Sequence, residues 1–241
     1  MSDRRYLVVN ADDFGMSPGV SRGIIDAHTN GIVTSTSLMV RTPAAVRAVE
    51  MSRDYPALSL GLHVDLCEWE YFDGEWRLVY EVVPLQDEAA VAGEIKRQYE
   101  RFCELVGRKP THIDSHQHVH REQPLRKHLV ELANAAGVPL RHCTPGLHYE
   151  SIYGQTAHGD PYPEGIDPFV LIDVLKGLHS GVSELACHPG DASDIDTKYR
   201  SERTVEQQIL CDPSVRAVID EEGITLCSFA EVREHLTLSV E

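Results

Sequence analysis

The sequence contains no long apolar run, and no stretch approaches the roughly 18 consecutive apolar residues that a transmembrane helix needs. The first residues, MSDRRYLVVNADDFG, also lack the apolar segment of a secretory signal and lead directly into charged sequence. These absences argue against a membrane-spanning or exported protein. They predict a cytoplasmic protein that has no membrane partner.

Positively charged residues are scarce, with 22 Lys and Arg against 38 Asp and Glu, which gives a net charge of −16. Such a charge repels a phosphate backbone or an anionic membrane surface, so nucleic acid is not an expected partner. Closely spaced cysteines are missing as well. The six cysteines lie far apart without a CxxC motif, in a chain too long to need disulfides, and we predict that they are reduced structural thiols.

Short apolar runs alternate with longer amphipathic stretches along the whole chain. This βαβα pattern is typical of a parallel sheet whose strands are connected by helices. A chain of 241 residues with 42% hydrophobic residues is long enough for one sizeable core. We therefore predict a single α/β domain over residues 1–241, an irregular or incomplete (β/α) barrel with strands at Tyr6–Asn10, Thr36–Val40, Leu58–Leu62, Thr111–Ser115, Val138–His142, Glu184–Cys187 and Ile224–Ser228.

Helix-end signals mark two of the connecting helices. Ser17 followed by proline is typical of an N-cap, so a helix is expected over Pro18–Asn30, ending at Gly31. A second helix, over Asp87–Val106, carries acidic residues in its first turn and ends at Gly107, as the helix dipole and the left-handed cap favour.

Two segments rich in aromatic residues, Gly and Pro are expected to be long loops, Cys67–Pro84 and Thr144–Asp167. In a β/α fold such long loops tend to form the walls of an active site. Their aromatic side chains suit either stacking on sugar rings or packing of each loop onto its own domain, and they are Trp69, Tyr71, Phe72, Trp76, Tyr149, Tyr153 and Tyr162.

Polar residues follow four of the predicted strands at the point where each strand ends. They are the Asp12-Asp13 pair, His63, His116 and His188. Because the carboxyl ends of parallel strands open on one rim, these side chains are expected to lie together, where such folds place their active sites. One Asp or His alone would more simply be a helix cap or a structural residue, but four coincidences at one rim predict a functional site.

The segment HIDSHQHVH is the densest cluster of histidines. If it stayed extended, its alternate residues would share one face, namely His112, Asp114, His116, His118 and His120. Four histidines cannot all reach one ion, and those beyond the end of the strand are expected to turn away. His118, His120 and Asp114 are expected either to orient a ligand or to be structural. Two imidazoles and one carboxylate from the rim suit one divalent ion with open positions, either Mg²⁺ or Zn²⁺.

The motifs NADDFG, GIIDAHTNGIVTSTSLMV, LGLH, RKPTHIDSHQHVH and a late HPG resemble the YdjC-like carbohydrate deacetylases, a family that includes chitooligosaccharide deacetylases. The resemblance extends from about Tyr6 to Phe229. It implies a β/α barrel-like fold related to polysaccharide deacetylases, a bound divalent metal and often a homodimer. It further implies that Asp13, His63 and His116 are the metal ligands.

By analogy with the wider deacetylase group, Asp12 resembles the catalytic base and His188 the general acid. The expected reaction is hydrolysis of an N-acetyl group on an acetamido sugar or short oligosaccharide by metal-activated water. Arg141 and Arg203 are candidates to contact the substrate or to orient an aspartate. For Arg203 a surface salt bridge is the simpler interpretation. The segment after LGLH and the loop 144–167 differ from sugar-processing members, which leaves the specific sugar open.

Three alternatives remain at this point. The protein could be a metal-dependent amidohydrolase acting on a non-sugar amide, a phosphoesterase, or a sugar-binding protein without catalysis. The surplus of negative charge disfavours phosphorylated substrates. An Asp-Asp pair beside two histidines has no use in a simple binding protein.

Overall fold

The computed structural model describes residues 4–236. Seven strands form one parallel sheet in the order β6-β3-β2-β1-β8-β7, with β9 beside the first residues of β1, and two further strands form a separate antiparallel hairpin. The strands are β1 (Arg5–Phe14), β2 (Ser35–Leu38), β3 (Ser59–Val64), β4 (Cys67–Phe72), β5 (Glu75–Glu81), β6 (Ile113–Ser115), β7 (Leu147–Ser151), β8 (Gly181–Cys187) and β9 (Ile224–Leu226).

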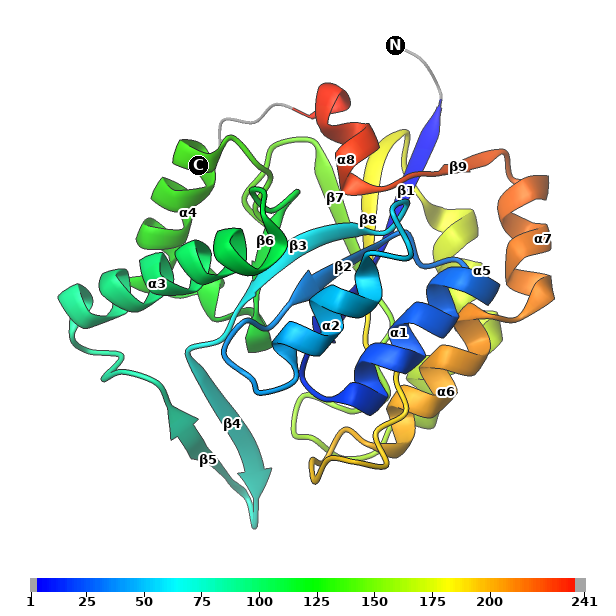
Figure 1. The fold of residues 1–241 in the computed structure, drawn as a ribbon. Coiled ribbons are helices and arrows are strands. Elements are labelled where there is room, and N and C mark those ends of the chain that lie inside the picture. The colour runs from blue at the N-terminus through cyan, green and yellow to red at the C-terminus, as the bar shows by residue number, and fades with distance from the viewer. Residues whose placement is uncertain (1–3, 237–241) are drawn as a thin grey trace.

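Helices cover the outer face of the curled sheet, and the hairpin of β4 and β5 extends away from the body (Figure 1). The α-helices are α1 (Pro18–Asn30), α2 (Ala45–Ser52), α3 (Glu88–Val106), α4 (Leu125–Ala136), α5 (Pro168–Gly177), α6 (Ser201–Leu210), α7 (Pro213–Glu221) and α8 (Phe229–Val232). Three short 3₁₀ turns are η1 (His116–Arg121), η2 (Pro163–Ile166) and η3 (Arg233–His235). Within residues 4–236, no helix has the length and apolar character that crossing a bilayer requires.

The sheet is an incomplete β/α barrel, as the sequence predicted. Its strands are parallel and connected by helices, and its two ends, β6 and β7, do not pair with each other in the described part of the chain. The core between sheet and helices is apolar, with Leu7, Val9 and Leu62 fully buried. The carboxyl ends of β1, β3, β6 and β8 consequently face the same rim, which positions the site described below.

The two helix-end predictions are confirmed. The Ser17 hydroxyl accepts from the Val20 N–H at 3.0 Å, and the helix begins at Pro18. Helix α3 ends at Gly107, which has a φ of +78°, a left-handed conformation that glycine adopts without steric cost.

The expected strand at Val138–His142 is wrong. Only Leu140 forms an isolated parallel bridge, with Ile113. Pro139 has no N–H to offer to a neighbouring strand, and the Cys143 N–H donates to the Leu140 carbonyl, so the chain turns instead of continuing. His142 within this turn has a φ of +60°.

The loop expected at Cys67–Pro84 is in fact the β4–β5 hairpin. Its turn is Asp73-Gly74, with φ values of +50° and +87°, and two residues of positive φ are what a tight hairpin turn requires. The Asp-Gly dipeptide between alternating polar and aromatic residues was therefore an overlooked hairpin signal. The loop expected at Thr144–Asp167 likewise contains a strand, β7, which pairs in parallel with β8.

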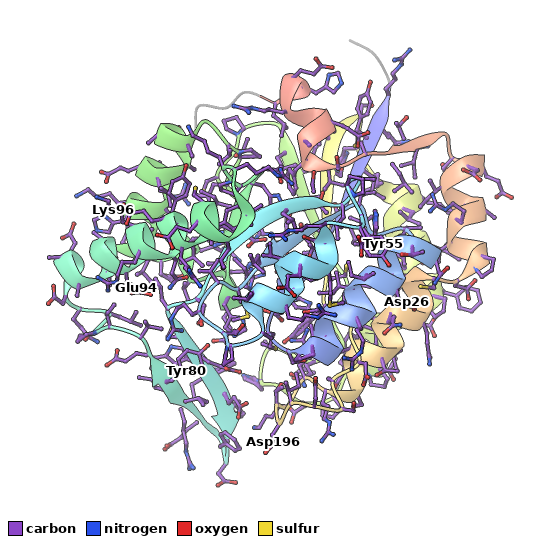
Figure 2. The ribbon with its side chains drawn as sticks, viewed as in Figure 1. Asp26, Tyr55, Tyr80, Glu94, Lys96 and Asp196 are labelled. Carbon is purple, nitrogen blue, oxygen red and sulfur yellow. The ribbon has the colours of Figure 1, made fainter. Side chains whose placement is uncertain are left out.

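Side-chain contacts at its base anchor the hairpin to the body. Tyr80, at the base of β5, donates to Asp65 at 2.7 Å, and Asp65 also pairs with Arg41 at 2.6 Å. Arg41 lies 3.6 Å from Glu94 on α3, and Figure 2 labels Tyr80 on the hairpin and Glu94 on the helix. This network fixes the direction in which the hairpin leaves the sheet.

Candidate active site

A cleft of about 820 Å³ opens at the carboxyl ends of the strands. All five residues that the sequence placed at the rim line it: Asp12, Asp13, His63, His116 and His188. Aromatic residues from both misassigned loops form its walls, namely Trp69, Tyr71, Trp76, Tyr149 and Tyr153, whereas Phe72 and Tyr162 lie outside the lining.

The two adjacent aspartates face different partners. A bulge interrupts the pairing of β1 with β2 between Ala11 and Phe14, and Asp13 within it has a φ of +68°. This left-handed conformation, unusual for a residue with a side chain, redirects the Asp13 carboxylate. Asp13 Oδ1 faces His63 Nε2 at 3.2 Å and His116 Nδ1 at 3.3 Å.

The cluster of Asp13, His63 and His116 fits a divalent metal ion. One ligand atom from each residue lies within 4.8 Å of the others. Asp13 Oδ1 and His63 Nε2 are buried without a hydrogen-bond partner in the described structure, and His116 turns its Nδ1 toward the same Asp13 oxygen. Metal–ligand bonds of about 2.0–2.1 Å separate neighbouring ligand atoms by about 3.0–3.4 Å, which matches the spacing of Asp13 Oδ1 from the two rings. The donor set, two imidazoles and one carboxylate, accepts either Zn²⁺ or Mg²⁺.

Buried groups behind the cluster fix the orientation of two of these residues. His63 Nδ1 pairs with Asp114 Oδ1 at 2.7 Å, which leaves Nε2 directed at Asp13. Burial alone would lower the pKa of His63, but Asp114 and Asp13 outweigh it and raise the pKa well above its usual range. Arg203 donates to Asp13 Oδ2 at 2.6 Å, so Oδ1 is the oxygen that remains free.

Asp12 is held in place by Arg141. The guanidinium donates to Asp12 Oδ2 at 2.6 Å and to Oδ1 at 2.7 Å, and Asn10 donates to Oδ1 at 2.9 Å. Burial opposes ionisation of Asp12, yet the Arg141 charge overrides it and holds the pKa of this carboxyl well below its usual range. Asp12 is therefore an ionised carboxylate that lines the cleft.

Arg141 has a side chain that is only 1% exposed, and it does not line the cleft. Besides Asp12 it contacts Asp114 at 2.9 Å and Glu184 at 2.7 Å. Of the two roles that the sequence left open for Arg141, substrate contact or orientation of an aspartate, the geometry favours the second.

His188 follows the last residue of β8, and its Nε2 lies 3.9 Å from Asp12 Oδ2. Burial lowers the pKa of His188 to about 4, so the ring is neutral at neutral pH. Its Nδ1 lies 4.0 Å from Glu206 Oε1, and its backbone N–H and the Tyr199 hydroxyl both donate to Glu206. Burial raises the pKa of Glu206 to about 8.

One sequence-based interpretation is wrong at this site, and two residues of the site were missed. Arg203 does not form a surface salt bridge, because its side chain is 3% exposed and pairs with buried Asp13. Glu184 and Glu206 were not identified from the sequence. A glutamate within the apolar strand segment SELAC was a signal for Glu184, since an acid inside a buried strand needs a partner. Glu206 carried no such local signal.

Alternate side chains of HIDSHQHVH lie on one face only as far as the end of β6. The strand ends at Ser115, and Gln117 and His118 in η1 have φ values of +50° and +54°. This turn carries His118 and His120 away from the first cluster, and they form a second group with His142.

Comparison with known proteins places these observations in a family. Residues 6–221 match the family model described as YdjC-like protein. A chitooligosaccharide deacetylase from Serratia marcescens is 35% identical over 251 aligned residues, which cover 95% of this chain and 99% of that protein.

Solved structures show the same fold. A proposed cellobiose-phosphate cleavage protein from Enterococcus faecalis V583 is similar with a TM-score of 0.73 and 26% identity, over 95% of this chain and 99% of that one. A family 4 carbohydrate esterase from Streptomyces lividans, in complex with acetate, has a TM-score of 0.54 at 12% identity, over 94% and 93% of the two chains. From the family match and the 35% identical relative, the chain belongs to the YdjC-like family.

Proposed function

We propose that the protein is a metal-dependent hydrolase that removes N-acetyl groups from acetamido sugars or short oligosaccharides. The observation that carries this proposal is the position of Asp12. This carboxylate is paired with Arg141 and shares one cleft with two neighbours. On one side is the cluster of Asp13, His63 and His116, and on the other is the neutral ring of His188. The relative from Serratia marcescens, a chitooligosaccharide deacetylase, supports the choice of substrate class.

Asp13, His63 and His116 would hold the divalent ion. When bound, such an ion polarises the acetyl carbonyl and lowers the pKa of a water. Asp114 keeps His63 in the tautomer with Nε2 toward the cleft, and Arg203 keeps one Asp13 oxygen free. These two buried partners therefore position ligands, and Arg203 also lines the cleft.

Asp12 and His188 move the proton. As the water oxygen bonds to the acetyl carbon, its proton passes to Asp12 Oδ2, the carboxylate oxygen nearer to His188. His188 is neutral beforehand, since its pKa is about 4, so it first receives from Asp12 the proton that was taken from water. His188 then protonates the sugar nitrogen as the C–N bond breaks, and the products are acetate and a free amino sugar.

The walls of the cleft suit a sugar. Trp69 and Trp76 of the hairpin are 38% and 52% exposed, and both line the cleft. Aromatic faces stack on the apolar faces of sugar rings, and apolar side chains gathered in one exposed groove are typical of a ligand-binding site. The side chain of Gln117 pairs with both backbone polar groups of Trp69 at 2.8 Å, which fixes this part of the hairpin over the rim.

A screen for acetate release tests the proposal. Chelated protein is reloaded with Mg²⁺ or Zn²⁺ and incubated with N-acetylglucosamine, its oligomers and other acetamido sugars. We expect acetate from at least one of these sugars with metal and none after chelation. Phosphate release from sugar phosphates without acetate release would overturn the proposal, and so would sugar binding without turnover at saturating metal.

A further inference from the structure

The second group of histidines, His118, His120 and His142, is not used by the mechanism above. One ring nitrogen of each lies within 4.8 Å of the others. The ring centroids are separated by 5.2 Å for His118 and His142, 5.7 Å for His120 and His142, and 5.9 Å for His118 and His120. Three imidazoles thus converge on one point beside the cleft.

Each ring has one nitrogen without a hydrogen-bond partner in the described structure: Nδ1 of His118, Nε2 of His120 and Nε2 of His142. On His118 and His120 the other nitrogen is occupied. His118 Nε2 pairs with the Tyr149 hydroxyl at 3.2 Å, and His120 Nδ1 pairs with the Ser115 hydroxyl at 2.6 Å. This is the pattern of a metal-binding histidine, in which a hydrogen bond at one nitrogen orients the ring and frees the other.

His120 is fully buried, and its free Nε2 is costly unless it meets a ligand. The Arg141 carbonyl faces the same ring but completes no hydrogen bond of normal geometry. The backbone is also strained where the rings converge, since His118 and His142 have φ values of +54° and +60°. Non-glycine residues in this conformation are uncommon and cluster at functional sites.

The rings are neutral imidazoles. Burial and the nearby Arg141 charge lower the pKa of all three, and the contacts of Arg141 with Asp12, Asp114 and Glu184 offset part of that charge. Neutral imidazole is the form of histidine that binds a metal ion. Access is open as well, because His118, His142 and Tyr149 line the cleft.

We propose that His118, His120 and His142 form a second metal site, separate from Asp13, His63 and His116, that binds a transition-metal ion of the Zn²⁺ class. Three neutral imidazoles select Zn²⁺, Co²⁺ or Ni²⁺ and do not suit Mg²⁺, which requires oxygen ligands. The first cluster, with its carboxylate, accepts both kinds of ion. The site does not depend on the proposed deacetylation.

Metal stoichiometry tests this site. Chelated protein is dialysed against Zn²⁺ or Mg²⁺, and bound metal is measured by mass spectrometry. We expect two equivalents of Zn²⁺ but one of Mg²⁺. His142→Asn should lose one Zn²⁺ and keep the Mg²⁺, and asparagine tolerates the positive φ at this position. His118→Asn should give the same result.

Two controls separate the sites. His179→Asn removes an exposed histidine and should leave both equivalents in place. Asp13→Asn should lose the Mg²⁺ and keep one Zn²⁺, and X-ray absorption of that Zn²⁺ should show three imidazole ligands. One Zn²⁺ equivalent in the unmodified protein would overturn the proposal. Two equivalents of Zn²⁺ in folded His142→Asn would also overturn it. So would an Asp13→Asn protein that binds no Zn²⁺, or whose bound Zn²⁺ has fewer than three imidazole ligands.

Discussion

The two histidine clusters differ in their neighbours more than in their own residues. Both take histidines from the short segment His116–His120. The first cluster is surrounded by carboxylates, and Asp114 and Asp13 raise the pKa of His63. In the second cluster, burial lowers the pKa of His142 to about 4, and no carboxylate belongs to the group. On the roles proposed above, imidazoles alone would hold an ion in the second cluster, while the proposed base and acid beside the first cluster would add a reaction.

The sharpest way to test this contrast is to remove the base. Asp12→Asn cannot accept the proton of the attacking water, so turnover should fall by about 10²–10⁴-fold while the metal content is nearly unchanged. Acetate release and bound metal are measured on the same preparation. Loss of metal with Asp12→Asn would mean that Asp12 and Asp13 have exchanged the roles given to them here.

Asp13→Asn should make the first cluster resemble the second. A neutral amide replaces the only anionic ligand, so Mg²⁺ affinity should fall by more than the roughly 10–100-fold typical of second-shell changes. Activity should return in part at high Zn²⁺ concentration, because two imidazoles remain. Titration of activity with each ion measures this, and full activity at low Mg²⁺ would remove Asp13 from the ligand set.

His188→Ala tests the acid, which the second cluster also lacks. Turnover on an N-acetyl sugar should fall by up to about 10²–10⁴-fold without a change in bound metal. An acetate ester should suffer less, because its leaving oxygen needs the proton less than a sugar nitrogen does. Equal losses on both substrates would show that His188 has another role.

The smallest effect concerns the buried acid behind His188. The pKa of Glu206 is raised from 4.5 to about 8 by burial, so the folded state favours the protonated form. Its contribution to stability is fully present below pH 4.5 and is lost as the pH rises through about 8. Glu206→Gln mimics the protonated form and should retain that contribution, which is at most a few kcal/mol at about 1.4 kcal/mol per pKa unit.

Thermal unfolding of chelated wild type and Glu206→Gln from pH 5 to 9 measures this effect. The melting temperature of the variant should exceed that of the wild type by a margin that grows as the pH rises. Parallel melting curves across this range would show that Glu206 is ionised in the folded protein.

The sequence by itself determined the parallel β/α architecture and the rim residues. Alternation of apolar strands and amphipathic helices is a local property, and polar residues directly after buried strands meet on one rim in any parallel sheet. The NADDFG, LGLH and THIDSHQHVH motifs therefore indicated Asp13, His63 and His116 as rim residues without knowledge of the strand order, and the resemblance to the YdjC-like family implied that they are the metal ligands. The Ser17 cap and the Gly107 helix end were also local signals.

Only the tertiary structure decided which side chains surround and orient these residues. Arg141 and Arg203 reach Asp12 and Asp13 across 129 and 190 residues of sequence, and such long-range pairings leave no local pattern. The bulge at Asp13 turns its side chain away from the direction that strand alternation predicts. The turn after Ser115 likewise separates the histidines into two clusters. Each of these depends on backbone conformations that the surrounding packing imposes, because non-glycine residues do not adopt a positive φ by intrinsic preference.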